Sequence, residues 1–284
     1  MSATHVVFQG EPGAFSEEAV LGFFGDARER VAVPTWRSVF EAVADGSANR
    51  GVIAIESSLA GTIRETYDLL GEYYDRDVRI VGEVAVPVRL ALLALPGQSL
   101  DWIERVYSHG QALVQADAFL RSREWQVMTT YNTAGAARMI AERRERNAAA
   151  VASPRVAALY GLEILANDIQ AGEENRTRFA VLAGQQAAST APAEPGVPHR
   201  TTLVFAVRNV PGSLHRCLGA FAARGVNLSS LESRPARRAR WEYVFWVDLD
   251  AAVDDPSCAA ALDDLRAETE MVRILGSYPR AAEA

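Results

Sequence analysis

Short apolar runs alternate with amphipathic segments through the first two thirds of the chain. Ser38 with Glu41, and Ser153 before Pro154, are typical helix start signals within those segments. The alternation predicts an α/β fold with parallel sheets and helices on both faces. The apolar runs are short and rich in β-branched or small residues, so we predict strands at His5–Phe8, Val31–Val33, Gly51–Ile55, Arg79–Val86, Val106–Tyr107, Val127–Thr130, Ala148–Ala152 and Phe179–Leu182.

The pattern changes between Gly184 and Arg200, which is rich in Ala, Pro, Gly and Gln and has no periodicity. We predict that 185–200 is a linker between domains at 1–184 and 201–284. The second domain reads β-α-β-β-α-β, the order of a ferredoxin-like unit. Its predicted elements are a strand at Thr201–Val207, a helix at Leu214–Ala223, strands at Val226–Leu231 and Trp241–Leu249 around a basic loop at Pro235–Arg240, a helix at Asp255–Glu268 and a strand at Val272–Tyr278.

Composition narrows the class of protein. The 284 residues are 49% hydrophobic and 23% charged, which is typical of a soluble globular protein of about two domains. The net charge of −7 argues against a nucleic-acid binder. No uncharged apolar stretch is long enough to span a membrane, and the N-terminus has no export signal, so we expect a cytoplasmic protein.

All 29 basic residues are arginine. The absence of lysine excludes a Schiff-base lysine, a pyridoxal phosphate anchor and a Walker lysine. The two cysteines and four histidines are scattered, so we expect neither a metal site nor a disulfide framework, and no cofactor.

Polar residues follow several predicted strands, where the carboxyl ends of parallel strands face a ligand crevice. Gly10 to Ser16 opens a helix after the first strand, and its backbone N–H groups could hold an anion. An ordinary strand–helix turn is the simpler explanation of that segment alone. Glu56, Ser57 and Ser58 could orient a polar substrate, or Ser58 could merely cap the next helix.

Two further segments join a strand to a helix. Ser108-His109-Gly110-Gln111 is followed one turn later by Gln115. Adjacent serine and histidine point in different directions and no G-x-S-x-G elbow is present, so a serine hydrolase is disfavoured and carboxylate binding fits better. Asn132 to Gly135 repeats the arrangement, although by itself it reads as an ordinary helix cap.

Two arginines flank Thr177. Arg176 and Arg178 suit a dicarboxylate, because guanidinium binds carboxylate through two parallel bonds. The alternative is a solvated basic loop balanced by Glu173 and Glu174. The basic run Arg234, Arg237, Arg238 and Arg240 is typical of a hairpin loop.

Taken together, these segments resemble the prephenate dehydratase family over nearly the whole chain. Serine stands at position 57 where the family has asparagine, and Gly110 where it has proline. The segments that carry the resemblance are Gly10–Ser16, Ile55–Ser58, Ser108–Ala112, Asn132–Gly135, Ala158–Leu162 and Thr177–Phe179, with Pro211–Leu214 and Glu232–Pro235 resembling the ligand motifs of an ACT domain.

The resemblance implies a two-lobed α/β catalytic domain similar to type II periplasmic binding proteins, at 1–184, followed by a ferredoxin-like βαββαβ ACT domain. The implied reaction converts prephenate to phenylpyruvate with loss of carbon dioxide and water, in the biosynthesis of L-phenylalanine. L-Phenylalanine would inhibit by binding the ACT domain, and pairing of ACT sheets would give a homodimer or homotetramer. Arogenate dehydratase and a non-catalytic amino-acid sensor of the same fold remain alternatives.

The implied site residues form a catalytic set, a substrate-binding set and an L-phenylalanine set. We expect neither nucleic acid nor a membrane as a partner. Our mechanistic hypothesis is that Thr177 hydrogen-bonds the departing hydroxyl, with Glu56 completing a relay. The catalytic set is Thr177, Ser108, Gln115, Glu56 and Ser57; the substrate-binding set is Phe15, Ser16, Ser58, Gly110, Gln111, Thr133, Ala134, Gly135, Arg178 and Phe179; the L-phenylalanine set is Asn209, Val210, Pro211, Gly212, Ser213, Leu214, Glu232, Ser233 and Arg234.

Overall fold

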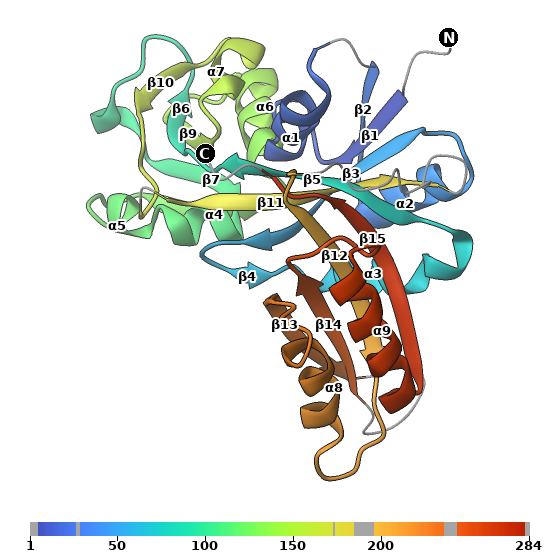
Figure 1. The fold of residues 1–284 in the computed structure, drawn as a ribbon. Coiled ribbons are helices and arrows are strands. Elements are labelled where there is room, and N and C mark those ends of the chain that lie inside the picture. The colour runs from blue at the N-terminus through green and yellow to red at the C-terminus, as the bar shows by residue number, and fades with distance from the viewer. Residues whose placement is uncertain (1–4, 27–28, 173, 185–195, 236–242, 282–284) are drawn as a thin grey trace. The chain divides into compact units, whose positions relative to one another are not determined.

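A computed structural model describes residues 5–26, 29–172, 174–184, 196–235 and 243–281 (Figure 1). The chain divides into two compact units. The first comprises 1–42, 51–64 and 85–179, and the second comprises 43–50, 65–84 and 180–284. Within the described ranges, no helix combines the length and the apolar character needed to cross a bilayer. Most of predicted linker 185–200 and basic loop 235–240 lies outside the described residues.

The first sheet has the strand order β2-β1-β3-β11-β5, and a short strand β4 pairs with β3. β1 and β2 are parallel, whereas β3 and β4 form a tight antiparallel hairpin. Strands and helices of this region are β1 His5–Gln9, α1 Phe15–Phe24, β2 Glu29–Val33, α2 Trp36–Ala44, β3 Arg50–Ser57, β4 Gly61–Thr62, α3 Arg64–Glu72, η1 Tyr74–Arg76, β5 Arg79–Pro87 and β11 Arg176–Ala183.

The second sheet has the order β10-β6-β9-β7-β8. β7 pairs in parallel with β8 and β9, while β6 is antiparallel to β9 and β10, so the sheet is mixed rather than parallel throughout. Its elements are β6 Ala91–Ala94, η2 Leu100–Trp102, β7 Arg105–His109, α4 Gly110–Gln115, α5 Asp117–Leu120, β8 Gln126–Thr130, α6 Thr133–Arg143, β9 Ala148–Ala152, α7 Arg155–Tyr160 and β10 Glu163–Ala166.

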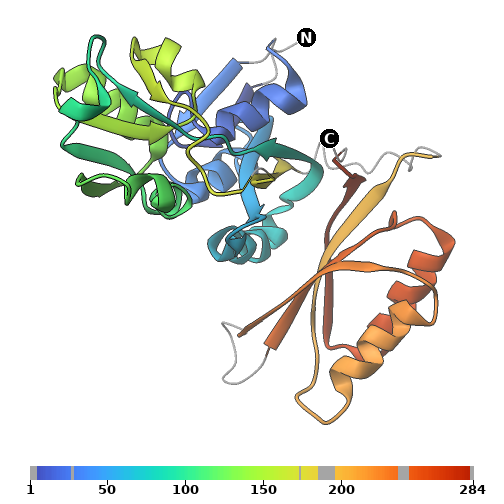
Figure 2. The same ribbon diagram turned by 90° about the vertical axis from the view of Figure 1, so that its left-hand side faces the viewer.

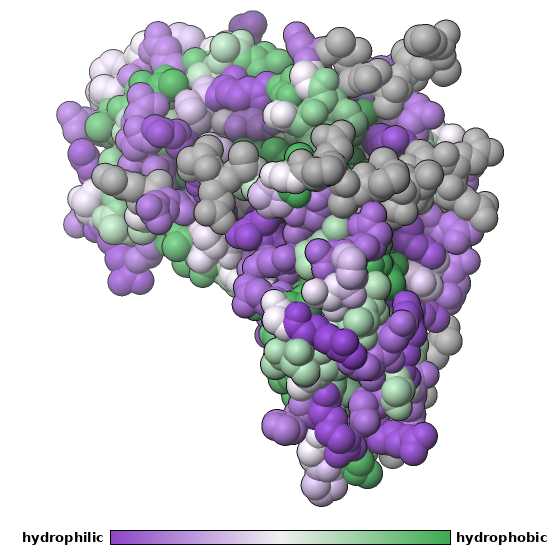
Figure 3. All heavy atoms as spheres, in the orientation of Figure 1, coloured by the Kyte–Doolittle hydropathy of each residue, from purple (hydrophilic) through white to green (hydrophobic). Residues whose placement is uncertain are grey.

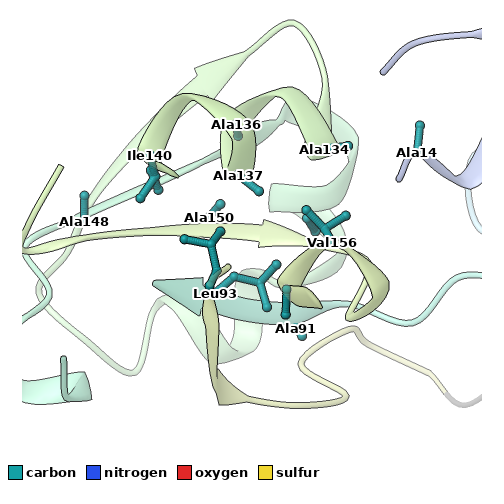
Figure 4. Packing of buried hydrophobic residues seen from close by; sticks show 13 residues of the cluster. Ala14, Ala91, Leu93, Ala134, Ala136, Ala137, Ile140, Ala148, Ala150 and Val156 are labelled. Carbon is teal, nitrogen blue, oxygen red and sulfur yellow. The ribbon is translucent and has the colours of Figure 1, made fainter. Parts of the chain in front are cut away.

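Both faces of the second sheet are covered, as predicted. Ala148, Ala150 and Ala152 of β9 pack on one face with residues of α6 and α7 (Figure 4). Ala149 and Val151 point to the opposite face, which is covered by residues of α4 and α5. Successive strand residues face opposite sides, so a fully buried strand reads as the continuous apolar run seen here. Two separate sheets agree with the expected two-lobed α/β architecture.

The C-terminal segment folds as the predicted β-α-β-β-α-β unit. Its antiparallel sheet has the order β13-β14-β12-β15. Both helices contribute to one apolar core on the same face of the sheet (Figure 2). The elements are β12 His199–Ala206, α8 Ser213–Ala222, β13 Leu228–Pro235, β14 Tyr243–Leu249, α9 Pro256–Glu268 and β15 Met271–Pro279. Asp255 begins α9 by accepting bonds from the N–H groups of Ser257 and Cys258.

Some sequence predictions of local structure are wrong. The helix predicted from Ser38 and Glu41 begins earlier, because Thr35 Oγ1 accepts the bond from Ser38 N. Ser153 makes no cap for α7; its hydroxyl donates to Glu18 instead. Strands β4, β6 and β10 were not predicted.

On the face seen in Figure 3, hydrophobic residues lie interspersed with hydrophilic ones.

Candidate functional site

The end of β3 meets the start of β11. Ser58 N donates to Arg176 O at 2.9 Å, and Arg176 N donates to Ser58 Oγ at 3.0 Å. Ser58 Oγ also donates to Glu174 O at 3.3 Å. The hydroxyl of Ser58 therefore fixes the polar loop that enters β11 and does not cap a helix.

Two positions before Ser58, Glu56 of β3 binds the guanidinium of Arg178. Both Nε and Nη2 of Arg178 lie 3.0 Å from Glu56 Oε2, and the arginine side chain is only 13% exposed. Ser58 with Arg176 and Glu56 with Arg178 fix an antiparallel register. Arg178 is thus already bound to a carboxylate. This contact partly neutralises the positive charge that the sequence analysis expected to bind the substrate.

The same register sets Ser57 opposite Thr177. Directly opposite residues of an antiparallel pair share one face of the sheet, and their neighbours along each strand point to the other. Ser57 and Thr177 therefore share a face, and Glu56 with Arg178 share the opposite one. This arrangement does not bring Glu56 to Thr177, so it gives no support to the expected relay between them.

The two hydroxyls on the shared face differ in their partners. Ser57 is buried, and its Oγ accepts a bond from Ala60 N at 3.3 Å within the β3–β4 turn. Thr177 is half-buried, and in the described part of the chain its hydroxyl has no hydrogen-bond partner. Thr177 is therefore free to donate to a bound molecule.

A pair of buried amides lies next to this strand. Asn175 Nδ2 donates to Gln115 Oε1 at 3.0 Å, and the two side chains are 2% and 7% exposed. Backbone bonds hold both residues: Val88 N donates to Asn175 O, and Ala171 N donates to Gln115 O, each at 2.7 Å. Gln115 was predicted from sequence, whereas Asn175 was not.

Ser108 and His109 do not form a nucleophile and base. Ser108 is fully buried, and its Oγ donates to Val151 O at 2.5 Å. His109 is exposed and caps α4, where its Nδ1 accepts from Gln111 N at 3.3 Å. Ser108 therefore ties β7 to β9, and the predicted backbone donor of Gln111 is already occupied.

The starts of α1 and α6 offer backbone donors. Asn132 caps α6 by accepting from Gly135 N at 3.0 Å, which leaves the N–H groups of Thr133 and Ala134 without partners among the described residues. Ala14 gives α1 no side-chain cap. The first N–H groups of a helix favour an anion. Of the remaining predicted contacts, Phe179 is buried in the interior, and Ser16 is buried on α1.

The loop before α1 is bound to α6 and α7. Glu11 accepts from Tyr131 Oη at 2.8 Å and from Arg138 Nη1 at 2.7 Å. Tyr160 Oη donates to Pro12 O at 2.9 Å. At Gly10, an added Cβ would come within 2.9 Å of Asn132, so this close approach requires glycine. The glycine-rich loop and the start of α6 are thus held side by side.

Sequence reasoning missed a half-buried carboxyl, that of Glu18, in the same region. Glu18 accepts a short bond of 2.5 Å from Ser153 Oγ, and Arg155 lies 4.0 Å away. Burial raises the pKa of the Glu18 carboxyl above its ordinary value, despite the hydrogen bond from Ser153. Glu18 and Ser153 are 135 positions apart in the sequence, so no local sequence pattern predicts that they are in contact.

The C-terminal unit contains a pocket of about 360 Å³ beside the start of α8. Five of the predicted L-phenylalanine residues line it: Asn209, Val210, Gly212, Ser213 and Leu214. Val207, His215, Tyr243 and Phe245 complete the lining. Pro211, Glu232, Ser233 and Arg234 are not part of this wall. Gly212 has φ of 80°, a left-handed conformation that allows the tight turn before the helix.

Arg234 faces a different partner. Its Nη2 donates to Asp68 Oδ2 of α3 at 3.0 Å, with both side chains about one fifth exposed. On β14, Trp246 packs against Gly71, where an added Cβ would lie 3.3 Å from the ring, and edge-to-face against Tyr67. These contacts, all within the second unit, attach the sheet to α3.

Comparisons with known proteins agree along the chain. The family model described as prephenate dehydratase matches residues 6–187, and the ACT domain model matches 201–267. A bifunctional chorismate mutase/prephenate dehydratase of Aquifex aeolicus is 35% identical, over 97% of this chain and 74% of that protein. Arogenate dehydratase 1 of Petunia hybrida is 39% identical, over 98% and 67% respectively.

Two solved structures are similar over almost their full length. Prephenate dehydratase of Arthrobacter aurescens in complex with L-Phe has a TM-score of 0.85 at 30% identity and covers 97% of this chain and 90% of its own. A protein described as GqqA, a novel type of quorum-quenching acylase, has a TM-score of 0.87 at 34% identity and covers 98% of both chains.

Proposed function

The chain belongs to the prephenate dehydratase family and carries an ACT domain, and we propose that it converts prephenate to phenylpyruvate with loss of carbon dioxide and water. The observation that carries this proposal is the Thr177 hydroxyl. It is half-buried, has no partner among the described residues and lies opposite Ser57. A positioned donor of this kind is what the departing hydroxyl requires.

The reaction needs donors rather than a strong acid. The ring carboxylate leaves as carbon dioxide, and its electron pair enters the ring as the ring C–O bond breaks. The departing hydroxide takes up a proton to become water, and the ring becomes aromatic, which drives the reaction. Thr177 donates a hydrogen bond to that oxygen as charge develops on it, which is electrostatic stabilisation in the transition state. A free threonine hydroxyl is far too weak an acid to serve as the bulk proton source.

The substrate is a dianion at neutral pH, so the site must also bind two carboxylates. The first N–H groups of α1 and α6 have no partner among the described residues, and they supply backbone donors for this purpose. Phe15 and Ser16 lie at the first start, and Thr133 and Ala134 at the second. Because Glu56 holds Arg178 on the other face, these amides make the larger share of the contacts with the substrate carboxylates.

Regulation is the second part of the proposal. The pocket beside α8 has the size and lining for one amino acid: apolar Val207 and Phe245 for an aromatic ring, and the start of α8 for a carboxylate. We assign this pocket to L-phenylalanine. The contacts of Arg234 and Trp246 with α3 then offer a route by which its occupancy reaches the chain segment that carries Ser57. A ligand can shift activity only if it binds one conformation better than the other.

Assembly and location complete the proposal. β13 is an edge strand, and Leu231 on it is 44% exposed, which supports pairing of this sheet with a second copy in a homodimer or homotetramer. The cysteines Cys217 and Cys258 are free and buried, as is usual in the cytoplasm, where we place the protein.

Arogenate is the second candidate substrate, and the curated relatives named arogenate dehydratases favour it equally. The two substrates differ only in an amino-acid side chain in place of a keto acid. One structural neighbour is described as an acylase, but Ser108, the serine next to a histidine in this chain, is buried with its hydroxyl bound to Val151 O and is not placed to act as a nucleophile.

One assay tests the function. The purified protein is incubated separately with prephenate and arogenate, and phenylpyruvate and phenylalanine are followed by absorbance and chromatography. Turnover of prephenate supports the proposal. Turnover of arogenate alone would mean that arogenate, and not prephenate, is the substrate. Absence of turnover with both, in a protein that still binds phenylalanine, favours a non-catalytic sensor.

A further inference from the structure

The buried amide pair beside Thr177 supports an additional residue for the reaction. We propose that Asn175 is a positioning residue that fixes the orientation of the Gln115 amide, so that Gln115 presents only N–H donors to the substrate. The inference rests on the proposed function and extends it to a residue outside the predicted site.

The direction of the hydrogen bond between the two amides supports this role. Asn175 Nδ2 donates to Gln115 Oε1 at 3.0 Å. A glutamine amide has one oxygen and one nitrogen, so holding the oxygen determines where the two N–H groups point. With its oxygen turned toward Asn175, Gln115 points its NH2 group, which carries two donors, the other way. Donors suit a dianionic substrate, whereas a flipped amide would present an oxygen and repel it.

The position of Asn175 in the chain supports the same role. It comes two residues before Thr177, and alternate residues of an extended chain point to the same side. The backbone of Asn175 is held by Val88 N at 2.7 Å, and that of Gln115 by Ala171 N at the same distance. The two backbones are therefore fixed, and the hydrogen bond between the side chains orients the pair relative to the strand that carries Thr177.

One atom of the pair is unpaired. Asn175 Oδ1 is buried and has no hydrogen-bond partner among the described residues, although the side chain is only 2% exposed. Leaving a buried acceptor unpaired costs free energy, and such atoms are typical of sites that a ligand or water completes.

The test is a double-mutant cycle with Asn175→Ala and Gln115→Ala. Asn175→Ala buries no new charge, so the variant should fold, as checked by circular dichroism. We expect it to lower kcat/KM about ten- to a hundredfold, the value of a hydrogen bond to a charged group. In the Gln115→Ala background the same change should cost less than about twofold, because Asn175 then has nothing to orient.

A second variant gives a pH signature. In Asn175→Asp the ionised carboxylate cannot donate to Gln115 Oε1, so the amide reverses and kcat/KM falls at pH 7.5. Once the introduced carboxyl group is protonated it can donate again, so part of the loss should recover as the pH falls toward 5. A structural defect would show no such recovery.

Asn147→Asp is the matched control. Asn147 lies in the same unit and donates through Nδ2 to Glu104 Oε1 at 3.3 Å, outside the site. It should leave kcat/KM within twofold and its pH profile unchanged. Equal losses from Asn175→Ala in both backgrounds, or no recovery in Asn175→Asp at low pH, would overturn the inference. Inactivity of the unmodified protein toward both substrates would instead refute the proposed function.

Discussion

Ser57 and Thr177 lie opposite each other on the neighbouring antiparallel strands β3 and β11 and share one face of the sheet. The register follows from the bonds of Ser58 with Arg176 and of Glu56 with Arg178 on either side. One hydroxyl is bound within a turn and the other is unpartnered among the described residues. The hydroxyl of Ser57 therefore has a structural role, whereas the hydroxyl of Thr177 is available for chemistry.

Replacing Thr177 with alanine should reduce turnover without unfolding the protein. Loss of one preorganised donor typically costs about 10²–10³ in kcat, and a half-buried hydroxyl with no partner in the described structure contributes little to stability. Thr177→Ser, which keeps the donor, should retain most of the activity. Steady-state kinetics and thermal unfolding measure both effects, and near-normal turnover in Thr177→Ala would remove Thr177 from the mechanism.

Glu56→Gln distinguishes the ion pair from a relay. Glu56 and Arg178 lie on the face opposite Thr177, so we expect turnover to fall less than tenfold. The unfolding free energy should drop by about 1 kcal/mol or less, because the carboxylate is 39% exposed. Kinetics and urea unfolding test this. A loss of turnover as large as that of Thr177→Ala would restore the relay.

Asp68→Asn should weaken feedback inhibition while leaving phenylalanine binding intact. Asp68 binds Arg234 across a partly buried contact but lies outside the pocket. We expect the residual activity at saturating L-phenylalanine to rise, with the dissociation constant from equilibrium dialysis unchanged.

Asp75→Asn is the control for that experiment. Asp75 pairs with Arg273 at 3.2 Å in the same unit, but its side chain is 58% exposed and its partner lies on β15. Inhibition should stay as in the unmodified protein. Equal effects of both changes would mean that the second unit was loosened generally rather than uncoupled at Arg234.

Glu18 makes a prediction about pH and stability. Its pKa is raised above 4.5 in the folded protein, mainly by burial. A carboxyl group whose pKa is higher in the folded state binds its proton more tightly there. Its contribution to the free energy of unfolding is therefore complete at pH values below its pKa in the unfolded chain. That contribution is lost as the pH rises through its pKa in the folded protein. Relative to Glu18→Gln, the unmodified protein should therefore gain stability as the pH falls from 7 toward 4.5. Urea unfolding at both ends measures this, and a difference that is constant or shrinks would contradict it.

The strands were predictable wherever burial and residue type agreed. Ala148–Ala152 forms β9 with the predicted bounds, and the C-terminal unit has the predicted order of elements. Ala91–Ala94 was missed because its alanines and leucines lack β-branching and occur as readily in helices. Pattern alone also could not show that β6 runs antiparallel to β9, which depends on pairing across the sheet.

The sequence predicted which segments form the site, but not the direction in which each side chain points. The resemblance named Thr177 and Glu56, yet the face on which each side chain lies depends on the register of β3 and β11, two strands more than a hundred residues apart. Arg234 belongs to a segment that the resemblance assigns to the ligand, and its contact with Asp68 could not be seen from that segment alone. Glu18 and Ser153 meet only because α1 and β9 approach each other in the folded chain.

The alanine-rich interior around β9 and α6 has a consequence for precision. An alanine side chain has no rotamers, so where alanine faces alanine the helix lies close to the strand and few side chains can rearrange to change their spacing. Enlarging Ala136 or Ala150 by even one branched carbon would push the helix outward and carry its amide-bearing first turn with it. The interior thus fixes the position of the first turn of α6 relative to β9, and Ala14, the residue before α1, packs in the same cluster.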